Sequence, residues 1–304
     1  MATPREVFER LFEGITAGRF AELSRLYAEN AVVEHPTAIP VPGRIEGRAA
    51  VHERFVSPLA ATLRISAGDV VVHETTDPEV IVAEYRYRVA SPRSGETVET
   101  DNIQMLRVRD GLIVHSRDYH DFLRMAAVQG AAANLADAYA QVPERRPGPV
   151  QPRPAQLADR KSPLGVFQRL CFGVSDQRWS ELPDLYAEQP DVRHPFLPGA
   201  SVLTSREDLR THFALAGELG IRMQATDLVT YQGTDPEVLI GEFAYEGQLG
   251  ATPFRVNNIF AMRVRDGLIV ESRDYGDHLA LAAAAGRLPE LIARVTTEMS
   301  PNHV

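Results

Sequence analysis

One stretch of fifteen residues occurs twice in this chain, with thirteen identical positions. Residues 107–121 read RVRDGLIVHSRDYHD, and residues 263–277 read RVRDGLIVESRDYGD. Other matches keep the same order: LYAEN comes before the pair His35-Pro36 as LYAEQ comes before His194-Pro195, and TDPEVIVAEY is matched by TDPEVLIGEF. A spacing of about 157 residues is too long for a solenoid unit and suits a small domain. The chain is therefore predicted to hold two copies of one domain.

Length and proline distribution place the domain boundaries. The chain has 304 residues, enough for two domains that each bury a working core. Residues 143–163 contain six prolines among charged and polar residues, which is typical of a semi-extended linker. We predict a first domain at 1–130, a Pro-rich linker at 131–162 and a second domain at 163–304.

Composition argues against several classes of protein. The formal net charge of -9 disfavours binding to nucleic-acid phosphates, which requires a basic face. Cys171 is the single cysteine, so it forms no intramolecular disulfide and is expected to be a small buried side chain. No apolar run reaches the roughly 18 residues of a membrane span, and the first residues lack a signal pattern. We expect a cytoplasmic protein with no nucleic-acid or membrane partner.

Local patterns in each copy predict helices followed by strands. In the first copy, Thr3-Pro4-Arg5-Glu6 combines a helix cap, a proline at the first helical position and a capping-box glutamate. A second short helix should carry Leu23, Leu26 and Tyr27. A third helix is expected near residues 49–63, and strands at 70–73, 80–89, 98–108 and 112–119, with a hairpin turn at Arg109-Asp110-Gly111. This order gives an α+β domain whose helices cover one face of a curved sheet.

The order of elements, with the motifs AENAVVEHP and DGLIVHSRDYHD, resembles the SnoaL-like branch of the NTF2-like superfamily. The resemblance covers about residues 4–130 and 163–290. It implies two tandem cone-shaped domains, each with helices packed on a curved, mainly antiparallel sheet around an apolar pocket. Many members dimerise through the sheet, so the chain is predicted to form an intramolecular pseudo-dimer. Further oligomerisation stays open.

Relatives in that superfamily include ketosteroid isomerases, limonene epoxide hydrolases and polyketide cyclases. The general base and two oxyanion donors of the isomerases correspond to His35, Leu11 and Gln104 in the first copy, and to His194, Leu170 and Phe260 in the second. The last Asp of the Asp-Arg-Asp set of the epoxide hydrolases corresponds to Asp118 and Asp274. The other two members of that set fall at Tyr85 and Tyr87, and at Phe243 and Tyr245. The resemblance thus supplies neither complete catalytic set.

Side-chain alternation predicts which groups enter each pocket. On the 80–89 strand the odd residues are apolar or aromatic while Glu84, Arg86 and Arg88 are charged, so the odd face should point inward. The first pocket is predicted to combine His35, Tyr85, Tyr87, Asn102, Gln104, Ser116, Asp118 and His120. The second is predicted to combine His194, Phe243, Tyr245, Asn258, Phe260, Asp274 and Gly276. The second pocket is the more apolar, and should bind more readily than it catalyses.

Among these residues, Asp118 is the favoured base, since desolvation in an apolar cone raises a carboxyl pKa. His35 would be the acid or relay, and Asn102 with a tyrosine would polarise a developing oxyanion. His120, Asp274 and His194 are further catalytic candidates; Tyr85, Tyr87, Gln104, Ser116, Phe243, Tyr245, Asn258 and Phe260 would contact substrate.

Structural roles compete with these assignments. Either Asp could simply hold the cone together through hydrogen bonds, and the His-Pro pairs suit a structural turn. Asp121 and Asp277 are better explained as helix caps or ion-pair partners. We predict no metal; a site built from His35, His73 and His120 is a less favoured alternative.

The sequence therefore predicts a cofactor-independent enzyme of small-molecule metabolism, secondary metabolism included. It would use acid-base chemistry on an apolar carbonyl-bearing or cyclic substrate, as an isomerase, a cyclase or a dehydratase-type lyase. Two alternatives remain: a non-catalytic carrier of an apolar ligand, and ring opening of the epoxide hydrolase type.

Overall fold

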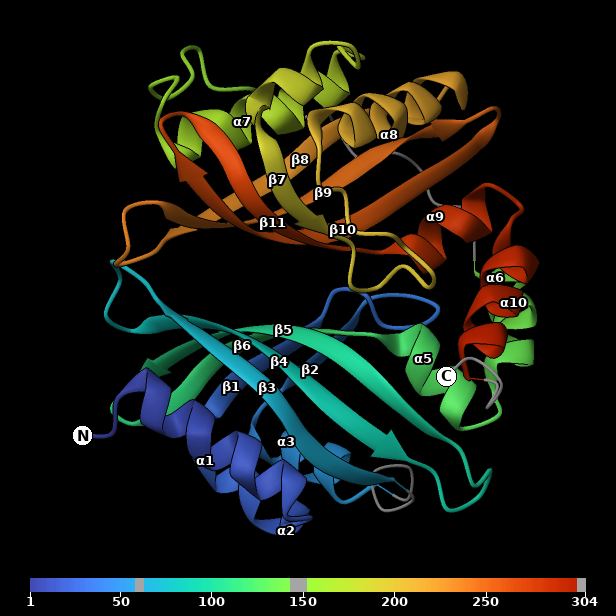
Figure 1. The fold of residues 1–304 in the computed structure, drawn as a ribbon. Helices are drawn as coiled ribbons and strands as arrows, with labels where there is room; N and C mark the ends of the chain where they lie inside the picture. Colours follow the sequence, from blue (N-terminus) through green and yellow to red (C-terminus); the bar gives the residue numbers. More distant parts are fainter. Residues whose placement is uncertain (58–62, 143–151, 300–304) are drawn as a thin grey trace. The chain divides into compact units, whose positions relative to one another are not determined.

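The structure, a computed structural model, describes residues 1–57, 63–142 and 152–299. The chain separates into two compact units, which we call the first and the second domain (Figure 1). The first comprises Met1–Val142 and the chain from Pro289 onward, and the second comprises Pro143–Leu288. This division differs from the predicted boundaries, because residues 131–142 and the last helix belong to the first domain. Of the predicted linker, residues 143–151 lie outside the described residues.

The first domain has the predicted α+β composition. Its helices are α1 (Pro4–Thr16), α2 (Phe20–Leu23), α3 (Arg48–Phe55), α5 (Phe122–Val128) and α6 (Leu135–Ala140), with 3-10 turns at Ser24–Leu26 and Ala132–Asn134. Its strands are β1 (Tyr27–His35), β2 (Gly43–Glu46), β3 (Arg64–Glu74), β4 (Val80–Ala90), β5 (Thr97–Arg109) and β6 (Leu112–His120). The capping box at the start of α1 is confirmed, with Thr3 and Glu6 each accepting a hydrogen bond from the other's backbone N–H. The predicted third helix ends at Phe55, and residues 58–62 are outside the described part.

Strand β1 is the main departure from the sequence-based prediction. The patterns predict a helix that reaches Tyr27 and no strand before His35, whereas Tyr27 opens β1. This strand pairs in parallel with β6, with Val33 opposite Ser116, in a sheet of order β2-β1-β6-β5-β4-β3. Because parallel partners are joined only through a long crossover, no local pattern shows this pairing. It carries His35 to the strand that holds Asp118.

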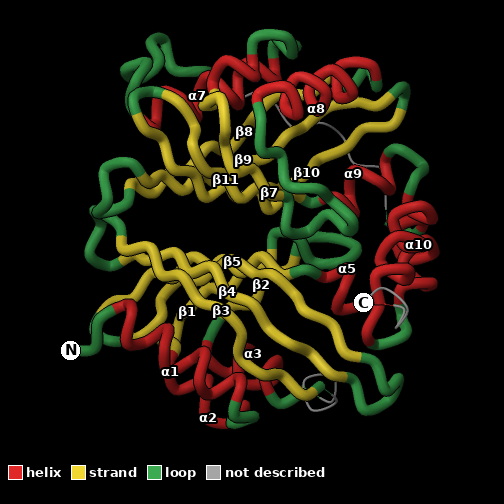
Figure 2. The backbone as a smooth tube through the Cα atoms, in the orientation of Figure 1, coloured by secondary structure: helices red, strands yellow, loops and turns green. Residues whose placement is uncertain are grey.

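The sheet and helices of the first domain enclose one core. The helices α1, α2 and α3 lie on one face of the sheet (Figures 1 and 2). Val7, Phe8 and Leu11 of α1 are buried in the same cluster as Ile81 and Tyr85 of β4. The predicted hairpin turn is confirmed: Asp110 and Gly111 have φ of 52° and 77°, as a type I′ turn requires.

The second domain repeats this plan with a five-stranded sheet of order β7-β11-β10-β9-β8. Its strands are β7 (Tyr186–Arg193), β8 (Arg222–Gln232), β9 (Val238–Leu249), β10 (Thr252–Arg265) and β11 (Leu268–Gly276). Its helical elements are α7 (Pro163–Ser175), a 3-10 turn at Leu182–Leu185, α8 (Arg206–Glu218) and α9 (His278–Ala284). In Figure 1, α7 and α8 lie on one face of this sheet. Cys171 of α7 is fully buried, and burial raises the pKa of its thiol, which fits the structural role expected of it.

Residues 152–162, part of the predicted linker, pack on the second domain. Arg153 forms an ion pair with Asp176 at 2.7 Å, and its guanidinium lies 4.9 Å from the centre of the Phe172 ring. The backbone N–H of Ala158 donates to Gln168 of α7 at 2.8 Å. These contacts hold residues 152–162, which precede α7 in the sequence, against the second domain.

The last helix, α10 (Leu288–Met299), extends from the end of the second domain into the first. Glu298 pairs with Arg124 of α5 at 3.0 Å, and Met299 packs against the first core. Leu291 and Val295 of the same helix are buried. The first domain therefore contains a helix contributed by the far end of the chain.

None of the helices in the described ranges is both long and apolar enough to cross a membrane.

Candidate functional sites

Each domain encloses a cavity lined by its own sheet and helices. The first cavity has a volume of about 190 Å³ and the second about 400 Å³. Pockets that hold drug-sized ligands measure roughly 300–1,000 Å³. Only the second cavity reaches that range, so the first is suited to a smaller molecule.

Most of the residues predicted for the first pocket line its cavity. They are His35, Tyr85, Tyr87, Asn102, Gln104, Asp118 and His120. Strand register explains this: Gln104 lies opposite Asp118, and Asn102 lies opposite His120, on paired strands whose alternate residues face one side. Ser116 differs from the prediction, since it is fully buried behind the wall and contacts Asp118 in place of a substrate.

Asp118 is a buried carboxyl held from one side only. Its Oδ1 accepts hydrogen bonds from Gln104 Nε2 at 2.7 Å and from the Ser116 hydroxyl. Among the described residues no hydrogen bond reaches Oδ2. Burial raises the pKa of Asp118 above its ordinary value, while the nearby His35 and the two hydrogen bonds oppose the shift. The free oxygen is thus available to a molecule in the cavity.

His120 is held in one orientation by Asn102. The Asn102 amide donates to the Thr100 carbonyl at 3.0 Å and to the Tyr85 carbonyl at 3.5 Å, which turns its Oδ1 toward His120 Nδ1 at 2.9 Å. Nδ1 therefore carries the proton, and Nε2 keeps its lone pair. Burial lowers the pKa of His120 to about 3, with His35 and Arg54 adding to the shift.

These contacts correct the predicted role of Asn102. Both amide hydrogens are committed to backbone carbonyls, so Asn102 has no donor left for an oxyanion and instead positions His120. Gln104 likewise holds Asp118. Donors that remain on the wall include the hydroxyls of Tyr27, Tyr85 and Tyr87, whose pKa values are raised by burial, so these phenols stay protonated.

His35 completes the group. Its ring lies 5.7 Å from that of His120, and its buried Nδ1 has no hydrogen-bond partner among the residues that the structure describes. Ligand atoms of His35, Asp118 and His120 all lie within 4.8 Å of one another, so these residues could hold a metal ion. His73 is not part of the set: its Nε2 lies 2.7 Å from Glu84, on the side of the sheet away from the cavity. The three-histidine alternative is therefore wrong.

Sequence patterns also missed Arg54, which lines the first cavity from α3 and is exposed there. Asp118 and Arg54 are the two charged residues among those lining this cavity. The signal that was missed is the correspondence between α3 and α8 in the two copies. Arg48 of α3 donates to the Tyr27 carbonyl, as Arg206 of α8 donates to the Tyr186 carbonyl. That match aligns Arg54 with His212.

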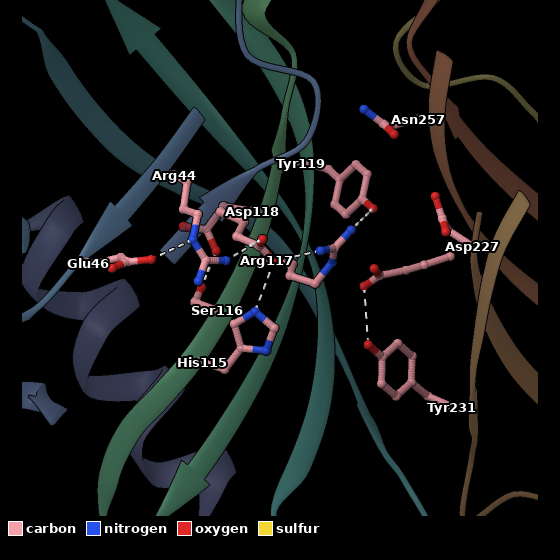
Figure 3. Close-up of polar contacts among 12 residues, drawn as sticks. Arg44, Glu46, His115, Ser116, Arg117, Asp118, Tyr119, Asp227, Tyr231 and Asn257 are labelled. Atoms are coloured by element: carbon pink, nitrogen blue, oxygen red, sulfur yellow. Dashed lines mark hydrogen bonds and ion pairs between the residues drawn. The ribbon is translucent and has the colours of Figure 1, made fainter. Parts of the chain in front are cut away.

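The opposite face of β6 carries a separate polar network. Figure 3 shows Arg44, His115 and Arg117 of this network, which gathers around Glu34. The distances to the Glu34 carboxylate are 2.9, 3.0 and 2.6 Å. None of these residues lines the cavity. The network therefore belongs to the outer face of the sheet.

The second cavity contains the predicted His194, Tyr245, Asn258, Phe260, Asp274 and Gly276. Phe243 does not line it. Its ring packs against Phe167 and Phe260 at 5.5 and 4.9 Å, which makes it a core residue. The predicted substrate contact at this position is therefore corrected.

Asp274 occupies the position in the second domain that Asp118 occupies in the first, but it accepts fewer side-chain hydrogen bonds. Ser272 donates to its Oδ1 as Ser116 does to Asp118, but Phe260 stands where Gln104 would supply the second hydrogen bond. Burial raises the pKa of Asp274 to about 7, with the Ser272 hydrogen bond and Arg273 opposing. The neutral form of this carboxyl is thus favoured over its charged form.

Two histidines that sequence reasoning did not select line the second cavity beside His194. They are His212 of α8 and His278, the first residue of α9. The His194 ring lies 5.1 Å from His212 and 6.4 Å from His278. Burial lowers the pKa of His194 to about 3 and that of His278 to about 4. His278 directly follows the repeated stretch, so extending the alignment by one residue pairs it with Phe122.

Asp121 and Asp277 have the predicted capping role. Each accepts a hydrogen bond from a backbone N–H in the first turn of the next helix, at 2.9 Å from Arg124 and 3.0 Å from Ala280. They fix the starts of α5 and α9, and so the positions of Phe122 and His278.

Fold and cavity together define an NTF2-like α+β domain in each half. The family model of the SnoaL-like domain matches residues 8–116. An uncharacterized PhzA/B-like protein of Pseudomonas aeruginosa is 35% identical over 112 residues, which cover 36% of this chain and 77% of that protein. The chain belongs to the SnoaL-like family.

Two further proteins show the same likeness. The uncharacterized protein YesE of Bacillus subtilis is 31% identical over 98 residues, covering 32% of this chain and 66% of YesE. The crystal structure of an NTF2-like protein from Burkholderia xenovorans covers 43% of this chain and 98% of its own, with a TM-score of 0.34 and 20% identity.

Proposed function

We propose that the first domain is an enzyme that transfers protons on a small, largely apolar carbonyl-bearing or cyclic substrate. The observation that carries the proposal is Asp118: a buried carboxyl with one free oxygen, at the wall of an apolar cavity that also holds two imidazoles. Such a carboxyl is a stronger base than an exposed one because its charged form is poorly solvated.

The steps follow from this arrangement. Asp118 takes a proton from the carbon next to the substrate carbonyl, and the electron pair of the broken C–H bond forms an enolate. A Tyr85 or Tyr87 hydroxyl donates a hydrogen bond to the enolate oxygen, which lowers the barrier to proton abstraction. His35 then donates a proton to another carbon of the enolate, and the proton held by Asp118 passes to His35, which restores both groups. Isomerisation, cyclisation and dehydration share this first step.

Ring opening of the epoxide hydrolase type is less well supported. That chemistry needs a second carboxylate and an Arg to activate water beside Asp118. Arg54 lines the first cavity, but Asp118 is the one carboxylate among its lining residues. A pure carrier role in the first domain would not require an unoccupied carboxylate oxygen.

Proton exchange tests the proposal without knowledge of the natural substrate. In D2O, the protein should speed deuterium incorporation beside the carbonyl of cyclohexanone or cyclohex-3-enone, as followed by NMR. The substitution Asp118→Asn should lower that rate by at least ~10²-fold, the scale of general-base loss. Asp274→Asn is the matched control and should change it less. Exchange that survives Asp118→Asn would exclude Asp118 as the base.

A further inference from the structure

A comparison of the two copies shows that a histidine side chain of the first cavity has no counterpart in the second. In the first domain, Asn102 Oδ1 lies 2.9 Å from His120 Nδ1. In the second, Asn258 keeps the same orientation, with its amide donating to the Val256 carbonyl at 3.1 Å, but Gly276 replaces the histidine. Asn258 Oδ1 is therefore an oriented acceptor with no hydrogen bond from the described residues.

A second polar atom borders the same space. A Cβ placed on Gly276 would lie 3.1 Å from Asn258 Oδ1 and 3.4 Å from His278 Nε2. That Nε2 is buried and has no hydrogen-bond partner in the described protein. Leaving a buried polar group unpaired is destabilising, so a bound group that pairs with it is favoured.

Most of the remaining wall is apolar, with Asp274, His194 and His212 as further polar groups. Leu170, Val174, Leu209, Phe213 and Met223 contribute to a cavity of about 400 Å³, within the range for drug-sized ligands. Mostly apolar walls disfavour a charged ligand, because a charge buried without a partner is strongly disfavoured. The ligand should be neutral and mostly hydrocarbon.

We propose that the second cavity binds a neutral, largely apolar molecule that carries a hydroxyl group, such as a phenol or an alcohol. The hydroxyl lies in the space left by Gly276, donates to Asn258 Oδ1 and accepts from His278 Nε2–H. A ketone or an ether cannot donate to Asn258, and a protonated amine would bring a charge. The site is thus specific for a hydroxyl, and it is independent of the proton transfer proposed for the first domain.

Three related probes test this specificity on the full chain: 2-naphthol, naphthalene and 2-methoxynaphthalene. Titration calorimetry should show 2-naphthol binding about tenfold more tightly than either analogue, because a site built to bond a hydroxyl rejects analogues that lack it. The substitution His278→Phe installs the residue that the first domain carries at this position, Phe122. It should remove the preference and leave naphthalene binding unchanged.

Two more variants guard against a misleading result. Gly276→Ser places a protein hydroxyl in the same space and should also remove the preference. Asn102→Leu alters the equivalent group of the first cavity and should leave the preference intact. The fluorescence of Trp179, the single tryptophan and a residue of the second cavity, checks that each second-domain variant is folded.

Several outcomes would overturn the inference: no binding of any probe, equal binding of all three, or a preference that survives in both His278→Phe and Gly276→Ser. Loss of the preference in Asn102→Leu would place the probe in the first cavity. No turnover is measured, so failure here leaves the proposed enzyme activity untouched.

Discussion

The two cavities are built on equivalent strands and share a Ser-x-Asp pair, yet their histidines come from different elements. In the first, His35 ends β1 and His120 ends β6; in the second, His194 follows β7, while His212 and His278 come from helices. The first Asp accepts two hydrogen bonds, and the second accepts one.

This difference separates the features of the site that the repeat preserves from those that it does not. The carboxyl is placed by strand register, which the repeat preserves. Its protonation and neighbours depend on a few side chains around it, which the repeat does not preserve. A small cavity whose carboxyl accepts two hydrogen bonds fits the proposed proton transfer, and a cavity about twice as large with unpaired polar atoms fits the proposed ligand binding.

The largest expected effect tests whether the first cavity contains an acid-base unit that the second lacks. If His35 and Asp118 act together, His35→Ala with Asp118→Asn should lose little more exchange activity than the worse single change, a loss of at least ~10²-fold. The pair His194→Ala with Asp274→Asn is the matched control and should have a smaller effect. Losses that multiply would leave Asp118 as an independent base and reduce His35 to a turn residue.

Next in size is a pH-dependent change in stability at Asp274. Its folded pKa of about 7 lies above the ordinary value near 3.8, so the folded state binds more protons between these values and stability falls as pH rises through this window. Asp274→Asn removes that loss. The variant should therefore be more stable than the parent at pH 8 and no more stable at pH 4.

Guanidinium unfolding followed by Trp179 fluorescence measures this for the second domain. His194 and His278 have lowered pKa values, so their contribution to stability has the opposite pH dependence and is lost as pH falls below about 6.5. Because variant and parent share these histidines, their contribution cancels in the difference between the two proteins. An equal difference at pH 4 and pH 8 would mean that packing, and not ionisation, explains it.

The smallest effect concerns α10, which gives the first domain a helix from the end of the chain. Val295 of this helix is fully buried, so Val295→Ala should destabilise the first domain by roughly 1–2 kcal/mol through lost contacts and a small cavity. Hydrogen exchange of β4 and β5 peptides should speed up, while the Trp179 unfolding midpoint stays constant. A shift of the Trp179 midpoint alone would assign α10 to the second domain.

The sequence by itself determined the features that depend on local geometry. Alternation along β4, β5 and β6 predicted which side chains line the first cavity, because neighbouring residues of a strand point to opposite faces. The Thr3 capping box and the Asp110-Gly111 turn were readable because each is a contact within a few residues.

Only the tertiary structure decided the rest. Four features depend on how distant parts of the chain pack. They are the parallel pairing of β1 with β6, the hydrogen bonds of the Asn102 amide to backbone carbonyls, the position of Phe243 in the core and the place of α10 in the first domain. His278 directly follows the repeated stretch in the sequence, but its proposed role depends on the space beside Gly276 and on Asn258 from another strand. Such contacts follow from how whole elements pack, and no periodicity along the chain encodes them.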